Sequence, residues 1–218
     1  DYIAAAMPQT AQSVILYDKQ GQRQIHSDLK DVQERPYPLD LFQQALPESD
    51  LAILGNINYT RPFLALVQQA GIPIATDVHT IATLDDAYNR DYMAAATILF
   101  MSDERLPVPP EQWAKWLQNE FGTEIVVIGL GAQGALLAVK AHNFCERLPA
   151  VYTRPVVNTV GAGDALFAAF THFYRTSHDP YQALSKAILF ASYKVGSSGA
   201  AVGFLNEAQL AVWAEKTG

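Results

Sequence analysis

Two glycines and an acid stand together where a loop meets an apolar stretch, between Asn158 and Asp164 in the sequence NTVGAGD. Glycine leaves its backbone N–H uncovered. The N-terminus of a helix also presents unpaired N–H groups and partial positive charge, which attract an anion. A carboxylate in that first turn suits a base that removes a proton while a neighbouring oxygen gains charge. The alternative is a glycine-rich turn in which Asp164 is only a first-turn helix acid.

The segment TVGAGD resembles the C-terminal signature of the ribokinase-like (pfkB-type) carbohydrate kinases, D-T-x-G-A-G-D. The resemblance implies that Asp164 deprotonates a sugar hydroxyl. It also implies that the amides of Gly161, Ala162 and Gly163 form the anion hole for the transferred phosphoryl group. One departure is visible, because Asn158 stands where the pattern begins with an acid. That position supports the loop rather than performing the chemistry, so the change is mild.

The elements around this motif alternate between apolar strands and amphipathic helices. Strands are expected at 50–54, 72–77, 97–101 and 124–128, with helices between them. Such alternation predicts an α/β fold with a mainly parallel sheet, whose catalytic residues lie beyond the carboxyl ends of the strands. The family resemblance implies a ribokinase-like three-layer sandwich with a small β lid. We assign residues 1–30 to the lid hairpin region and 31–218 to the nucleotide-binding and catalytic domain.

Several helix boundaries have clear signals. Pro110 suits the first position of a helix that Gly122 ends. Asp179 and Pro180 form a cap and first position of another. Thr60 is expected to cap a helix that runs to Ala70. Further helices are expected near 39–45, over 161–175 and from Asn206 or Glu207.

A second glycine motif, GLGAQG at 129–134, matches the dinucleotide-binding pattern G-x-G-x-x-G. That pattern requires a helix next, whereas short apolar segments at 135–139 and 144–148 favour two strands. In the resembling family the corresponding segment is T-x-G-x-x-G, which passes the nucleotide phosphates. Gly129 replaces its threonine, and Gly131 and Gly134 are retained.

The resemblance implies ATP and Mg²⁺ as cofactors and leaves a monovalent cation (K⁺) open. The helix from Asp179 and the glycine/serine-rich loop after it would flank the adenine, with Ser192 at the family's frequent asparagine position and Gly199 in the loop. Glu104 matches the acid of the family's N-x-x-E segment, which orders the water shell of Mg²⁺, and Met101 replaces its asparagine. Mg²⁺ prefers oxygen ligands and keeps several waters. The alternative is that Glu104 is a solvated loop acid.

Asp77 and His79 follow another predicted strand end. They could approach substrate or phosphate, or Asp77 could simply cap the next turn. The five histidines show no ligand spacing, so zinc is not supported. Ser13 to Tyr17 and Gln22 to His26 predict a hairpin with its turn at 18–21. In the resembling family such a hairpin closes over the sugar and often pairs with a second subunit.

Composition excludes several classes of partner. A formal net charge of −7 makes nucleic acid a poor partner. No apolar run approaches the ~20 residues of a membrane span, and no signal segment opens the chain. The single cysteine, Cys145, fits a reducing cytoplasm.

The first hypothesis is an ATP-dependent kinase that phosphorylates a sugar hydroxyl. A nucleoside kinase of the same family, a non-catalytic nucleotide- or sugar-binding regulator and, more distantly, an NAD oxidoreductase are the alternatives. Family members normally begin with further residues that hold most of the sugar contacts. We therefore expect residues 1–218 alone not to phosphorylate a sugar at a useful rate.

Overall fold

The computed structural model describes residues 2–5, 7–17 and 23–217. A six-stranded sheet has the order β3-β4-β5-β6-β7-β8. Its strands are β3 (Ala52–Ile53), β4 (Ile74–Asp77), β5 (Ile98–Ser102), β6 (Ile125–Gly129), β7 (Ala135–Val139) and β8 (Phe144–Leu148). Strands β3 to β6 are parallel, and β7 and β8 are antiparallel additions. The predicted mainly parallel sheet is confirmed.

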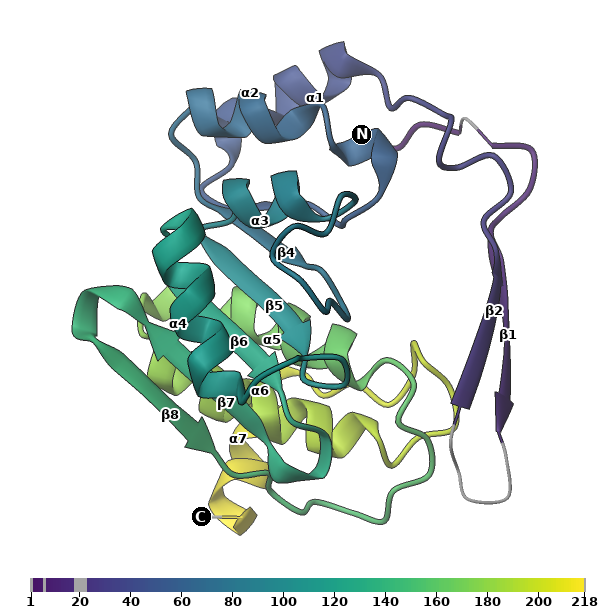
Figure 1. Ribbon diagram of the computed structural model, residues 1–218. Helices are drawn as coiled ribbons and strands as arrows, with labels where there is room; N and C mark the ends of the chain where they lie inside the picture. Colours follow the sequence, from purple (N-terminus) through teal and green to yellow (C-terminus); the bar gives the residue numbers. More distant parts are fainter. Residues whose placement is uncertain (1, 6, 18–22, 218) are drawn as a thin grey trace.

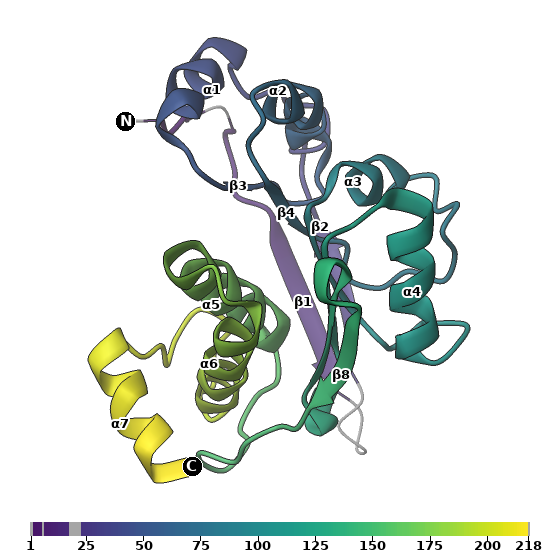
Figure 2. The same cartoon turned by 90° about the vertical axis from the view of Figure 1, so that its left-hand side faces the viewer.

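Helices cover both faces of this sheet, as Figure 2 shows with the sheet between them. Helices α1 (Leu39–Ala45), α2 (Phe63–Gln69), α3 (Arg90–Ala95) and α4 (Pro110–Phe121) lie on one side. Helices α5 (Ala162–Ser177) and α6 (Pro180–Lys194) lie on the other, with α7 (Glu207–Thr217) outside them. This arrangement is a three-layer sandwich.

Strand β5 shows why two helical layers are needed. Its residues are buried in succession, and alternate side chains point to opposite faces. Leu99 and Met101 join the apolar cluster that contains Trp113 of α4. Ile98 and Phe100 join the cluster on the other face, where Phe100 packs on Phe170 of α5. A parallel strand of this kind requires apolar cover on both sides.

The predicted hairpin is present as β1 (Gln12–Tyr17) and β2 (Arg23–Asp28), an antiparallel pair. Its turn at 18–21 lies outside the described residues. Figure 1 shows the hairpin at one side of the α/β body, on long connections. Its apolar side chains Val14, Leu16 and Ile25 are exposed. The division into regions 1–30 and 31–218 stays a prediction.

Most boundary predictions are confirmed and one is wrong. Helix α4 begins at Pro110 and ends at Gly122, whose φ of 78° is left-handed. The Asp179 side chain caps α6 by accepting the amides of Tyr181 and Gln182. Thr60 does not cap α2, which starts only at Phe63. Thr60 instead ends a 3₁₀ turn (Asn58–Thr60), and its hydroxyl donates to backbone carbonyls of the preceding loop.

Candidate active site

The carboxyl ends of β4, β5 and β6 meet at one edge of the sheet. Asp77 ends β4, and Ser102 lies beside Gly129 at the ends of β5 and β6. The loops that follow are joined, because the Ser102 amide donates to His79 O at 2.6 Å and the Asp103 amide donates to Gly129 O at 3.1 Å. Ligands of open α/β sheets bind at this edge.

The NTVGAGD segment forms the N-terminus of α5, as predicted. Gly161 is the residue before the helix and has a φ of 79°, a conformation that side chains rarely adopt. A Cβ atom there would lie 2.8 Å from Ala200 O, so glycine is also required by close backbone approach. Gly163 differs, because a Cβ atom there would meet nothing within 4 Å. Open space therefore adjoins the backbone where a phosphate is expected.

The three predicted anion-hole amides are not equivalent. The Ala162 amide donates to Thr159 O at 3.1 Å. Within the described part of the chain, the amides of Gly161 and Gly163 have no hydrogen-bond acceptor. Unpaired amides at a helix N-terminus form an anion-binding site. The amides of Gly161 and Gly163 are therefore available to an anion, and their contact with a phosphoryl group stays a prediction.

The turn before α5 is anchored on the end of α6. The amides of Val157 and Asn158 both donate to Val195 O, at 2.8 and 3.0 Å. The Asn158 side chain accepts the Val160 amide at 2.9 Å and donates to Ser198 O at 2.7 Å. An ionised aspartate could not make the second bond, because it has no N–H to donate. Asn158 thus links the two loops directly.

Two carboxylates share the site. Asp164 is exposed in the first turn of α5. Asp77 is mostly buried, and its Oδ1 accepts the His79 amide at 2.8 Å. Burial raises the pKa of Asp77, and the charge of Asp164 adds to the rise, whereas His79 opposes it. Asp77 therefore caps the turn after β4 and is near enough to Asp164 for the two charges to interact.

Comparisons with known proteins agree with this geometry. The sequence pattern described as pfkB family carbohydrate kinase matches residues 86–207, more than half of the chain and all of the NTVGAGD turn. The chain belongs to the pfkB family of carbohydrate kinases.

Two curated relatives are described as a fructosamine kinase and a deoxyribokinase. Fructosamine kinase FrlD of Bacillus subtilis is 26% identical over 213 residues, which cover 92% of this chain and 69% of the relative. Deoxyribokinase of Salmonella typhi is 35% identical over 78 residues, which cover 36% of this chain and 24% of the relative. The matched regions thus span between about a quarter and two thirds of these relatives.

Solved structures show the ribokinase-like fold. A microbiome-derived acarbose kinase has a TM-score of 0.82 and 24% identity, with 93% of this chain and 68% of that chain covered. Ribokinase from Thermotoga maritima has a TM-score of 0.74 and 20% identity, with 94% and 69% covered. These likenesses confirm the predicted fold class.

The second glycine motif of this pfkB-family chain is a strand connection. A 3₁₀ turn (Gly131–Gln133) joins β6 to β7, so the helix of a dinucleotide-binding site is absent after Gly134, as expected. Gly134 has a φ of 98°, and a Cβ atom there would lie 2.1 Å from Leu148 O. Gly129 is half-buried at the end of β6, and Gly131 is exposed in the turn. Contacts of Gly129, Gly131 and Gly134 with a nucleotide stay a prediction.

The end of α6 and its following loop are held by several side-chain contacts. The Ser192 hydroxyl donates to Val151 O at 2.7 Å, so it already ties α6 to the segment before the NTVGAGD turn. Arg154, which the sequence reasoning missed, lies over the Tyr193 ring and donates to Tyr193 O and the Ser197 hydroxyl. Gly199 follows in the loop. The assignment of Ser192 and Gly199 to the nucleotide stays a prediction.

The residues fit ATP and a water-coordinated Mg²⁺. The open backbone at Gly163 can admit a phosphate, and Glu104 is exposed just after β5. Among the described residues, no three His, Cys, Asp or Glu side chains are grouped to hold a metal directly. Mg²⁺ in nucleotide sites is held by one or two carboxylates, waters and phosphates. Glu104 fits the role of one such carboxylate, and its contact with Mg²⁺ stays a prediction.

Sequence reasoning also missed Lys194, which is completely buried at the end of α6. Its ammonium donates to Val160 O, one residue before Gly161. The signal was present, because Lys194 lies seven residues after Ala187 on the apolar stripe of α6. A charge in a buried stripe requires a partner.

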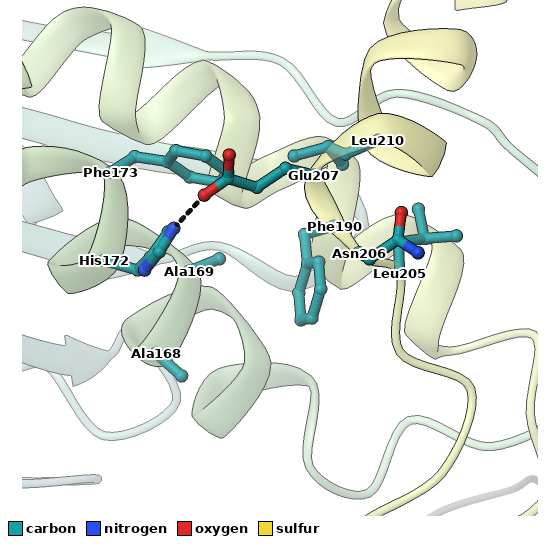
Figure 3. A pocket seen from close by; sticks show the side chains of 9 residues that line it. All are labelled: Ala168, Ala169, His172, Phe173, Phe190, Leu205, Asn206, Glu207 and Leu210. Atoms are coloured by element: carbon teal, nitrogen blue, oxygen red, sulfur yellow. Dashed lines mark hydrogen bonds and ion pairs between the residues drawn. The ribbon is translucent and has the colours of Figure 1, made fainter. Parts of the chain in front are cut away.

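A cavity of about 390 Å³ lies elsewhere, among α5, α6 and α7 (Figure 3). Apolar side chains such as Phe173, Phe190 and Leu210 line it, and His172 pairs with Glu207 across it at 2.7 Å. Its α5 residues lie beyond the first turn, so Asp164 takes no part in it.

No helix in the described portion of the chain is long and apolar enough to cross a membrane.

Proposed function

We propose that this chain contains the nucleotide-binding and catalytic elements of a kinase that transfers the γ-phosphoryl group of ATP to a sugar hydroxyl. The observation that carries the proposal is Asp164, an exposed carboxylate in a first helical turn whose Gly161 and Gly163 amides have no acceptor among the described residues. A base and an anion hole are thereby held on one rigid element.

The residues divide the chemistry between them. The hydroxyl oxygen attacks the γ-phosphorus in line, its proton passes to Asp164, and the bond from phosphorus to the β–γ bridging oxygen breaks to release ADP. The amides of Gly161, Ala162 and Gly163 stabilise charge on the transferred group. Ala162 must share or release its bond to Thr159 O to contribute. Glu104 would orient the water shell of Mg²⁺, which offsets phosphate charge when bound.

A sugar is favoured over a nucleoside as the acceptor. The family pattern is that of carbohydrate kinases, and the relatives named above are described as a fructosamine kinase and a deoxyribokinase. A nucleoside kinase of Burkholderia thailandensis in complex with inosine shares the fold at 19% identity. That likeness is one of fold alone, and it keeps a nucleoside acceptor as the second candidate.

We also propose that the hairpin pairs with a second copy of the chain. Val14 and Leu16 share one face of β1 and are 61% and 52% exposed. An isolated two-stranded hairpin is marginally stable in water, so apolar cover from a partner would stabilise it.

We propose a cytoplasmic location as well. Cys145 is an exposed free thiol, which fits a reducing compartment.

The experiment is an ADP-release assay on the full-length protein with a panel of sugars, sugar derivatives and nucleosides. We expect ATP turnover that depends on a sugar hydroxyl and on Mg²⁺. Turnover with nucleosides alone would favour the second candidate. Tight ATP binding without acceptor-dependent turnover on any member would contradict a kinase and favour a binding regulator.

A further inference from the structure

Lys194 is a fully buried cation whose position is unusual for a lysine. Its relative exposure is 0%, whereas Lys186 on the same helix is only partly buried and interacts with Gln182 and the Phe173 ring. Transferring an ammonium out of water is costly unless a partner offsets the loss. Burial accordingly lowers the pKa of Lys194, and the charge of Asp164 opposes that fall.

Within the described residues, the side chain of Lys194 interacts with the turn before α5. The ammonium donates to Val160 O, and the next residue is Gly161. Asp164 is the acid whose charge acts on Lys194. The ammonium therefore lies behind the helix N-terminus at which the phosphoryl group is expected. A fixed positive charge in a site that excludes water is worth more than one in solvent.

The same turn is a poor site for K⁺, which is held by several oxygen ligands such as backbone carbonyls. Val160 O accepts from Lys194, and Val195 O accepts two amides. Ser198 O accepts the Asn158 side chain, so position 158 offers an amide rather than a carboxylate. Each of these three carbonyls is therefore engaged, and the buried ammonium already binds one of them, Val160 O. These residues do not fit a monovalent metal cation.

We propose that Lys194 is a positioning residue whose ammonium holds the Val160–Gly161 turn in place, supplies the positive charge behind the anion hole and makes a monovalent metal cation unnecessary. This inference rests on the proposed kinase function. It concerns the support of the anion hole and leaves proton transfer to Asp164.

The first test needs no variant. Acceptor-dependent ADP release by the full-length protein is measured in a buffer whose only monovalent cation is tetramethylammonium, and KCl is then added. We expect the same turnover with and without K⁺. Activation by about tenfold or more, an effect comparable with the loss of a catalytic hydrogen-bond donor, would overturn the proposal.

The second test replaces the charge. Lys194→Met keeps the length of the side chain and should lower kcat by about 10–100-fold with little change in the acceptor KM, because an anion-hole support acts mainly in the transition state. Lys194→Arg should retain more activity than Lys194→Met. Lys186→Met on the same helix is the matched control and should behave as the unchanged protein. Equal kcat for Lys194→Met and Lys186→Met would overturn the proposal.

A binding measurement separates this inference from the kinase proposal. Calorimetry compares ADP with a non-hydrolysable ATP analogue, which carries a γ-phosphate. Lys194→Met should weaken binding of the analogue more than binding of ADP, even if no acceptor is found. Equal weakening of both ligands would mean that Lys194 only supports the fold. If Lys194→Met does not fold, Lys194→Gln and the K⁺ titration of the unchanged protein decide the matter.

Discussion

At the scale of single residues, the site combines two carboxylates, Asp164 and Asp77, with one buried ammonium, that of Lys194. Asp164 is exposed in the first turn of α5, Asp77 is partly buried at the end of β4, and the buried Lys194 ammonium donates to Val160 O in the turn before α5. Each buried charge works against folding because it loses water. Two such groups beside one exposed carboxylate are typical of a functional site rather than of a structural core.

The raised pKa of Asp77 predicts a dependence of stability on pH. Folding favours the neutral carboxyl, so this contribution is fully present below the unfolded pKa of about 3.8 and is lost as pH rises through the raised value. Asp77→Asn stays neutral at every pH and can still accept the His79 amide. The variant should therefore be more stable than the unchanged protein at pH ~7.5, and the difference should shrink toward pH ~4.

Urea unfolding at several pH values measures this difference. Asp103→Asn is the control, because Asp103 is an exposed acid in the neighbouring loop. A stability gain for Asp77→Asn that does not change with pH, or a loss of stability at neutral pH, would contradict the conclusion that burial raises the pKa of Asp77.

At the scale of elements, the end of α6 fixes the start of α5. Val195 O, Ser198 O and the Lys194 ammonium all bind the 157–160 segment. Helices α5 and α6 pack along one apolar cluster, so this corner is held by the core as well as by polar bonds. The proposed anion hole is therefore preorganised before any ligand arrives.

Alanine substitutions at the two glycines of the turn should separate effects on the stability of the fold from effects on kcat. Gly161→Ala should destabilise the fold by about 1–3 kcal/mol, because the left-handed φ is retained only with strain and Ala200 O is too close. Gly163→Ala should stabilise the helix by up to about 1 kcal/mol. The added methyl group should nevertheless lower kcat about tenfold or more, because it covers the approach of the phosphate.

Thermal unfolding and steady-state kinetics on both variants give the comparison. Gly163→Ala with unchanged kcat would show that the phosphoryl group does not approach this amide. A loss of stability in Gly163→Ala equal to that in Gly161→Ala would contradict the open space at Gly163.

Sequence reasoning succeeded where a local signal decides the structure. Gly122, Asp179 and the apolar 135–139 run each act within a few residues, so their roles were predictable. The effect of the Asp164 charge on Asp77 and the contact of Lys194 with Val160 O depend on chain folding over long separations. Thr60 failed as a cap because Tyr92, Gly55 and Ile57 offered its hydroxyl other partners.

At the scale of the whole molecule, the sheet carries the site at one edge and the hairpin stands beside the body. The two apolar clusters on opposite faces of the sheet hold the α/β body together without using β1 or β2. The hairpin can therefore be altered without unfolding that body, and its exposed apolar face can be tested separately.

The double variant Val14→Lys with Leu16→Lys should convert a dimer into a monomer, because it places charge on the face proposed to pair. Light scattering gives the mass, and thermal unfolding of the body should change little. Gln43→Lys with Gln44→Lys on α1 adds the same charge elsewhere and should leave the dimer intact. A monomeric unchanged protein would refute the proposed pairing.

The most direct test of the account is Asp164→Asn in the full-length protein, with kcat and ADP affinity measured together. Asp40→Asn is the matched control, since Asp40 is also an exposed first-turn helix acid but lies in α1. Loss of a positioned base should lower kcat by about 10²–10⁴-fold while the ADP dissociation constant stays the same, and Asp40→Asn should change neither. Near-normal kcat in Asp164→Asn would show that Asp164 is only a first-turn helix acid and would contradict the mechanism.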